Sequence, residues 1–113
     1  MTKHYIDNDR FEELILLYQE DPKEHERELF SLFDLLIHNI INAYGFTVDL
    51  EDAKQECFLL ILKTLNKFNP DNGKAFNYFT TIIMNNLRLM YTKNKKYSDK
   101  LEAYEDIIKS KNS

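Results

Sequence analysis

Aromatic, amide and basic side chains alternate between Lys67 and Phe79, in the stretch KFNPDNGKAFNYF. This stretch holds four of the chain's fifteen aromatic residues and one of its two glycines. Rings stack on unpaired bases while ammonium groups neutralise the neighbouring phosphates, and each stacked base contributes roughly 1–3 kcal/mol. The residue types therefore indicate contact with single-stranded nucleic acid.

Polar and basic residues continue beyond this stretch. Asn85 and Asn86, followed by Arg88, offer amide and guanidinium groups to base edges or phosphates. A basic end then follows, made of Lys93, Lys95 and Lys96. A second interpretation of the rings stays open, because aromatics at helical spacing more often face a core, and Phe76 and Phe79 fit such a position equally well.

The charges are unevenly distributed along the chain. Residues 1–62 contain five Lys/Arg and fourteen Asp/Glu, residues 63–100 contain eight and two, and residues 101–113 contain two and three. A basic segment inside an acidic chain indicates a nucleic-acid-facing end, although charge runs are also common on solvated helix faces. The charges alone leave both interpretations open.

Signatures of catalysis and of bound cofactors are missing from the sequence. His4, His25 and His38 are scattered, and no glycine-rich phosphate loop or nucleophile motif is present. The sequence Asp71-Asn72-Gly73 lacks the spaced acidic ligands of a calcium loop. We therefore expect no enzyme activity, no metal and no cofactor.

The chain of 113 residues is long enough for one hydrophobic core. No apolar run reaches the length of a membrane span and no N-terminal signal pattern is seen, so we expect a cytoplasmic protein without a membrane partner. The single cysteine, Cys57, lies in an apolar stretch and is predicted to be part of the core.

Helical periodicity predicts an all-α fold of about four helices, with residues 1–96 as the domain and 97–113 as a polar tail or linker. Asp21 and Asp49 are expected N-caps, Pro22 suits a first turn, and Gly45 suits a helix end. The predicted helices are 9–20, 22–44, 50–68 and 75–96, with Pro70 and Gly73 interrupting the chain between the last two. The predicted core positions are Phe11, Leu14, Ile15, Tyr18, Leu29, Phe33, Leu36, Ile37, Ile40, Tyr44, Ala53, Cys57, Leu60, Ile61, Leu65, Phe68, Phe76, Phe79, Ile83, Leu87 and Met90.

Asp52, Gln55 and Glu56 form a D-x-x-Q-E pattern, followed by an apolar helix and a Lys-Phe ending. This arrangement resembles the second conserved region of bacterial sigma factors, and the resemblance covers about residues 29–96. It implies a fold of packed helices that binds RNA polymerase. By position, the resemblance assigns these three residues to contacts with the clamp helices of the polymerase core.

Residues 69–87 are similar to the loop and the promoter-reading helix of the same family: a polar turn, a glycine, two spaced aromatics and an apolar helix with polar residues. The resemblance implies capture of a base flipped from the non-template strand of the melted minus-ten element. It also implies that Asn85 and Asn86 read the upstream edge of the element as duplex. The predicted DNA-binding residues are Phe68, Asn69, Asn72, Lys74, Asn77, Phe79, Thr81, Asn85, Asn86, Arg88, Lys93, Lys95 and Lys96.

The chain departs from the family pattern at two pairs of residues. Ile82 and Ile83 stand where housekeeping sigma factors carry two tryptophans, and this chain has none. Asn85 and Asn86 replace an arginine-glutamine pair. We therefore expect a different means of strand separation and a different base preference.

Because the sequence ends at Ser113, we expect no domain that reads the minus-thirty-five element. This layout resembles the late-transcription sigma factors of T-even-type bacteriophages, which rely on a further protein, so a coactivator is an expected partner. A fragment of a longer minimal sigma factor is the alternative.

Three functions remain open at this point. The first is a sigma-type initiation factor for bacteria or phage-infected cells, which docks on RNA polymerase and captures the minus-ten element. The second is a sigma-mimicking adaptor or inhibitor that binds polymerase without reading DNA. The third is an unrelated helical bundle whose basic helix binds duplex DNA.

Overall fold

The computed structural model describes the backbone of residues 6–112 and, within that range, the side chains of residues 6–93, Lys100 and Ala103. Its elements are α1 (Asn8–Glu20), α2 (Pro22–Tyr44), α3 (Leu50–Thr64), two short 3-10 turns, η1 (Leu65–Lys67) and η2 (Pro70–Asn72), and α4 (Ala75–Asn112). Residues 6–112 contain no strand. The predicted all-α class with about four helices is confirmed.

Local capping signals account for most helix boundaries. The Asp7 carboxylate accepts hydrogen bonds from the amides of Asp9 and Arg10, at 3.0 and 3.1 Å, and begins α1. Asp49 accepts from the Asp52 amide at 3.0 Å and begins α3, as predicted. Gly45, with φ of 63°, ends α2 in the left-handed conformation.

Two boundary predictions were wrong, and one N-cap lacks its capping bond. Asp21 is the N-cap residue of α2, as predicted, but its side chain makes no capping bond, and its amide donates to the Leu17 carbonyl at 2.9 Å at the end of α1. The α-helical part of the third helix ends at Thr64 and tightens into η1 before Phe68. α4 continues past Lys96 to Asn112, because no glycine or proline follows Lys74 to stop it.

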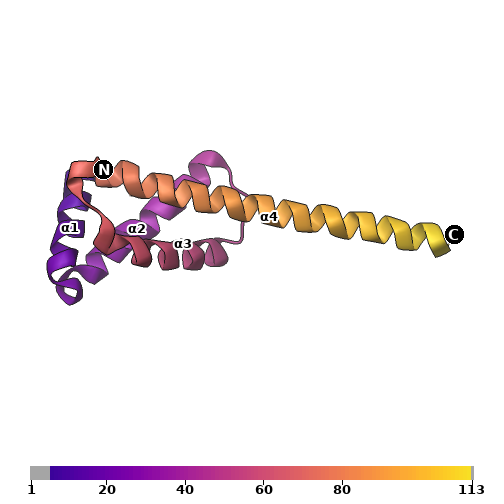
Figure 1. Ribbon diagram of the computed structural model, residues 1–113, viewed down its shortest axis with the longest axis horizontal. Helices are drawn as coiled ribbons and strands as arrows, with labels where there is room; N and C mark the ends of the chain where they lie inside the picture. Colours follow the sequence, from indigo (N-terminus) through magenta and orange to yellow (C-terminus); the bar gives the residue numbers. More distant parts are fainter. Residues whose placement is uncertain (1–5, 113) are drawn as a thin grey trace.

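The other three helices are arranged around the first half of α4 (Figure 1). α1, α2 and α3 pack against this half, and the second half of α4 projects away from them, which gives overall extents of 65 × 32 × 25 Å. The loop from η1 to the start of α4 lies at the end of the bundle where α1 crosses it. The projecting half of α4 includes residue 96, so no helix boundary falls there. The division into a domain of residues 1–96 and a tail of residues 97–113 stays a prediction.

Three phenylalanines form the centre of the core. Phe11, Phe33 and Phe79 come from α1, α2 and α4, and their rings meet edge to face with centroids 5.0 Å apart for Phe11–Phe33, 5.1 Å for Phe33–Phe79 and 6.2 Å for Phe11–Phe79. Most predicted core positions, including Cys57, are buried. The prediction for Tyr44 was wrong: this last residue of α2 is 61% exposed, and its ring lies beside Phe46.

No helix within the described residues combines the length and apolarity that crossing a membrane requires. The same part of the chain holds no cluster of three or more His, Cys, Asp or Glu side chains suited to a metal ion.

Candidate protein and nucleic-acid interfaces

One side of α3 is turned to solvent along its whole length, opposite its buried residues Ala53, Cys57 and Ile61. We call this side the α3 face. Its polar part contains the three predicted polymerase contacts, all of which are exposed. Its apolar part contains Leu59 and Leu62, which are 54% and 46% exposed. The α3 face consists of Asp52, Gln55, Glu56, Leu59 and Leu62.

Leu59 and Leu62 were missed at the sequence level. The signal was present, because both fall outside the spacing that buries Ala53, Cys57 and Ile61. Large exposed apolar side chains next to carboxylates are typical of a surface that binds another protein. The α3 face therefore has the composition of a docking surface.

One side of α4 brings five of the predicted DNA-binding residues into a single line. We call these residues the α4 stripe: Lys74, Asn77, Thr81, Asn85 and Arg88. All five are exposed, and their spacing of three or four residues places them on the side opposite the core. The Thr81 hydroxyl already donates to the Asn77 carbonyl at 2.8 Å. The other four side chains offer two positive charges and two amides to a nucleic-acid strand.

The structure corrects the expected roles of Phe68 and Phe79 as exposed stacking platforms. Phe79 is 0% exposed and Phe68 is 5% exposed. Phe68 lies against Phe79 and Tyr78, with ring centroids 5.8 and 5.5 Å apart. Both phenylalanines therefore support the loop from inside, because the helix spacing that suited a platform equally suited a core.

Tyr78 is the ring that remains partly exposed in this group, and it was missed at the sequence level. Its ring centroid lies 5.0 Å from that of Phe79, and its side chain is half-buried. The available signal was a tyrosine among phenylalanines, because the tyrosine hydroxyl favours a position where one edge of the ring is exposed to solvent. Tyr78 can present part of its ring beside the loop.

The loop between η1 and α4 has a defined internal conformation. The Asn69 carboxamide oxygen accepts from the Asp71 amide at 2.9 Å, and the Asn72 amide donates to the Asn69 carbonyl at 2.9 Å. Gly73 has φ of 121°, a conformation that side chains disfavour, as its position in the loop predicted. This conformation leaves Asn69, Asn72 and Lys74 exposed.

Asn86 points away from the α4 stripe and toward α3. Its amide nitrogen lies 3.4 Å from the Cys57 sulfur and 3.9 Å from the Met90 sulfur, and the side chain is half-buried. Burial raises the pKa of the Cys57 thiol, and the hydrogen bond from Asn86 acts in the opposite direction. Cys57 is thus a neutral core group that accepts a hydrogen bond, and Asn86 joins α4 to α3.

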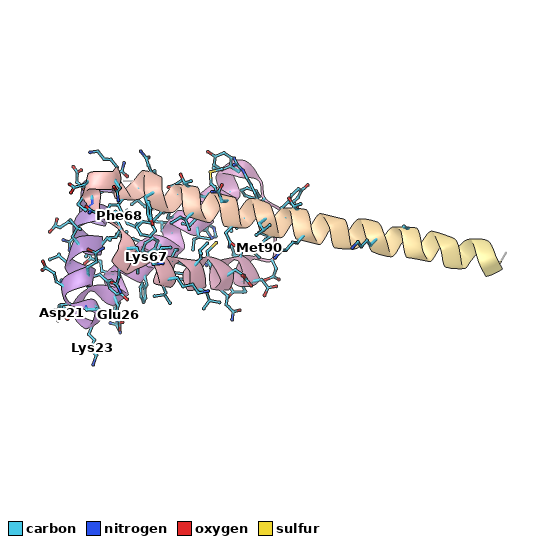
Figure 2. The ribbon with its side chains drawn as sticks, viewed as in Figure 1. Asp21, Lys23, Glu26, Lys67, Phe68 and Met90 are labelled. Atoms are coloured by element: carbon cyan, nitrogen blue, oxygen red, sulfur yellow. The ribbon has the colours of Figure 1, made fainter. Side chains whose placement is uncertain are left out.

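The basic end of the predicted DNA surface is divided. Lys93 lines a groove between α3 and α4 together with Glu56 and Met90, so it lies on a different side of α4 from the α4 stripe. Met90 marks the place where α4 leaves the other helices (Figure 2). The side chains of Lys95 and Lys96 lie outside those that the structure describes.

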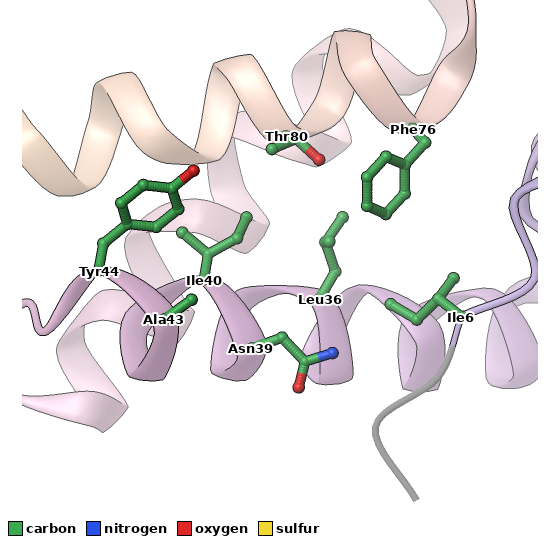
Figure 3. Close-up of a pocket in the computed structure, with 8 residues that line it drawn as sticks. All are labelled: Ile6, Leu36, Asn39, Ile40, Ala43, Tyr44, Phe76 and Thr80. Atoms are coloured by element: carbon green, nitrogen blue, oxygen red, sulfur yellow. The ribbon is translucent and has the colours of Figure 1, made fainter. Parts of the chain in front are cut away.

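Two hollows border α4 on the side of α2 and α1. A cavity of about 310 Å³ between α2 and α4 is lined by Leu36, Ile40, Phe76 and Thr80 among others (Figure 3). The Thr80 hydroxyl is buried there without a hydrogen-bond partner among the described residues. A smaller hollow of about 160 Å³ opens beside Lys74 and Asn77.

The structure is a small helical domain with two exposed surfaces. The α3 face is acidic and apolar, and the α4 stripe is a line of amides and cations, so the domain is a docking module with two surfaces. The family model for sigma-70 region 2 matches residues 32–97, more than half of the chain, and the chain belongs to this family. Searches of curated proteins and of solved structures returned no match.

Family membership confirms the resemblance to region 2 of sigma factors, whereas the likeness to phage late-transcription sigma factors stays a prediction. The domain gives the chain a sigma-type role in transcription initiation, which involves binding RNA polymerase and recognising the minus-ten promoter element. The match includes α3, the loop and the α4 stripe, whereas α1 lies outside it.

Proposed function

We propose that this protein is a promoter-specificity factor that docks on the clamp helices of RNA polymerase through the α3 face and captures the melted minus-ten element through the loop and the α4 stripe. It acts by binding, without catalysis of its own. The observation that carries the proposal is the presence of both surfaces, on adjoining helices, within the residues matched by the sigma-70 region 2 family.

Docking on polymerase combines two kinds of contact on the α3 face. Asp52 and Glu56 supply negative charge and Gln55 an amide, and none of the three is committed to an ion pair within the described residues. Leu59 and Leu62 add apolar surface that is buried from water when the complex forms. The charges orient the partner, and the leucines contribute most of the affinity.

Capture of DNA relies on the loop rather than on the two buried phenylalanines. Asn69, Asn72 and Lys74 surround the point where a flipped base arrives, and Tyr78 offers the accessible ring edge. Farther along, Asn85 and Arg88 contact base edges and phosphates of the non-template strand. Phe68 and Phe79 hold this surface in shape from the core.

The experiment that tests the proposal measures binding of a fluorescent single-stranded minus-ten oligonucleotide to the chain alone, to bacterial RNA polymerase core alone, and to the mixture. We expect tight binding for the mixture only, because the excess of acidic residues before α4 repels phosphates in the free chain. Equal binding by the chain alone would contradict the proposal that the chain captures DNA only together with polymerase.

The burial of Phe68 and Phe79 favours one other candidate function, that of an adaptor or inhibitor that occupies polymerase without reading DNA. Such a protein would bind the polymerase core equally well. It would add no oligonucleotide binding to the mixture, and it would lower run-off transcription by a competing sigma factor. The two functions are therefore separated by the sign of the effect on transcription.

The orientations of the two asparagines predict different effects on base preference. We expect Asn85→Ala to relax the preference at one base position by about 1–3 kcal/mol, because its exposed amide is free to bond a base edge. Asn86→Ala should weaken transcription similarly on all promoters, because this residue joins α4 to α3.

Run-off transcription on promoters that differ by single bases in the minus-ten element measures both effects. Asn85→Asp serves as a second variant, because it keeps the size of the side chain and replaces the amide donors by acceptors. A change of base preference caused by Asn86→Ala and absent for Asn85→Ala would reverse the assignment.

A further inference from the structure

Two side chains of α1 contact the two ends of the loop that joins α3 to α4. The Gln19 amide nitrogen donates to the carbonyls of Leu65 and Phe68, at 2.9 Å each. The Glu12 carboxylate accepts a hydrogen bond from the Ala75 amide at 3.0 Å. Both contacts are partly buried.

The spacing of these residues matches the loop that they contact. Glu12 and Gln19 are seven positions apart, so they lie on one side of α1 and about 10 Å apart along its axis. α1 contacts η1 through Gln19 and the start of α4 through Glu12. In Figure 1, α1 crosses the end of the bundle where the chain passes from η1 to α4.

Two of these backbone groups lie at helix ends: Phe68 follows η1, and Ala75 is the first residue of α4. The last carbonyls of a helix and its first amides lack intrahelical partners. Lys74, the residue before α4, has no side-chain acceptor, and Phe68 has no polar side chain. A carboxylate at a helix N-terminus is also favoured by the helix dipole. Glu12 therefore acts as the cap that the sequence next to α4 does not provide.

The loop's own hydrogen bonds fix its internal shape and not its position on the bundle. Those that lie within it join Asn69 to Asp71 and Asn72, and Pro70 to Gly73. None of these bonds reaches α1, α3 or α4. Within the described residues, the hydrogen bonds that hold the loop in place on the bundle are those of Gln19 at its start and of Glu12 at its end.

We propose that α1, which lies outside the residues matched by the family, is the positioning element for the base-capturing loop, with Gln19 and Glu12 as its positioning residues. The inference rests on the proposed function of the loop. The geometry of base capture is then set by a helix that carries none of the residues of the α3 face or the α4 stripe. Loss of either contact should reduce DNA capture and leave polymerase binding intact.

Four variants of the full chain test the two contacts. Gln19→Glu keeps the shape of the side chain but faces two carbonyls with a carboxylate, and Gln19→Ala removes the donor without adding charge. Glu12→Ala removes the acceptor of the Ala75 amide. Glu12→Gln retains an acceptor oxygen and is expected to preserve the contact.

Glu13→Ala is the matched control for Glu12→Ala. Glu13 is the exposed neighbour of Glu12, and its carboxylate contacts Arg10 at 3.1 Å on the surface of α1. The control therefore removes the same side chain from the same helix without touching the loop.

Amide hydrogen exchange of the free protein and oligonucleotide capture by the polymerase mixture are the two measurements. We expect the Ala75 amide to exchange about tenfold faster in Glu12→Ala, and the amides of residues 69–74 to exchange faster in the Gln19 variants. Oligonucleotide capture should fall about tenfold in these variants. Affinity for the polymerase core should stay within about twofold, and Glu12→Gln and Glu13→Ala should match the wild type throughout.

The outcomes distinguish failure of this role from failure of the proposed function. If wild-type protein and polymerase capture the oligonucleotide and the Gln19 and Glu12→Ala variants capture it equally well, the positioning role of α1 is overturned alone. A parallel fall in polymerase affinity would also overturn it, because the effect would then be general. If the wild-type mixture captures no oligonucleotide, the proposed function fails and this role fails with it.

Discussion

Replacement of Phe79 by alanine is expected to lower the free energy of unfolding by about 3–5 kcal/mol. The ring is 0% exposed and contacts Phe11, Phe33 and Phe68, with centroids 5.1 to 6.2 Å away. Its removal leaves a cavity where three helices and the loop meet. Because domains of this size are stable by roughly 5–15 kcal/mol, the variant loses a large share of its stability.

Urea denaturation followed by circular dichroism measures this loss. Tyr91→Ala is the matched control, because Tyr91 lies on the same helix, is 40% exposed, and should change stability by less than about 0.5 kcal/mol. If Phe79→Ala remained as stable as the wild type and lost DNA capture, the ring would have to face DNA after all.

Charge reversal at Glu56 is expected to reduce the affinity for RNA polymerase by more than about tenfold. Glu56 is exposed at the centre of the α3 face, with no ion pair among those that the structure gives for the described residues, so the folded chain should tolerate Glu56→Lys. Leu59→Asp should have a similar effect, because it places a charge where apolar area is dried on docking.

Retention on immobilised polymerase core measures both variants. Glu26→Lys is the matched control: it makes the same charge change at an exposed residue of α2, next to the turn that follows α1 (Figure 2). Circular dichroism confirms that each variant is folded. Wild-type retention of Glu56→Lys and Leu59→Asp would exclude the α3 face as the docking surface.

Retention on polymerase and run-off transcription together assign separate parts to α3 and α4. A variant of the α3 face that is folded but not retained shows a docking defect. A variant of the α4 stripe that is retained but does not transcribe shows a defect in reading DNA. The sigma-mimicking adaptor predicts the first class of variant and not the second.

Most of the fold was predictable because its signals act over a few residues. Asp49 caps α3, Pro22 lies in the first turn of α2, and Gly45 and Gly73 take the positive φ that only glycine adopts readily. The buried stripe of each helix follows from its 3.6-residue period. Tyr44 was misplaced because periodicity alone does not say how far along α2 the other helices cover its buried side.

The candidate site was predictable in part. The α4 stripe and the polar part of the α3 face are exposed side chains, and their residue types are visible in the sequence. The burial of Phe68 and Phe79 was not decidable, because a ring at helical spacing suits a platform and a core equally well. The apolar part of the α3 face was missed although its signal was present, because Leu59 and Leu62 fall outside the spacing that buries Ala53, Cys57 and Ile61.

The sequence by itself determined the helical class, most helix boundaries, the acidic and basic halves, and the family, because each depends on residue types or on near neighbours. Only the tertiary structure decided that Asn86 turns to Cys57, that Phe79 is enclosed, and that α1 contacts both ends of the loop. Glu12 and Ala75 are 63 positions apart, and Gln19 and Phe68 are 49 apart. Contacts over such separations depend on how whole helices pack, and no local pattern specifies that packing.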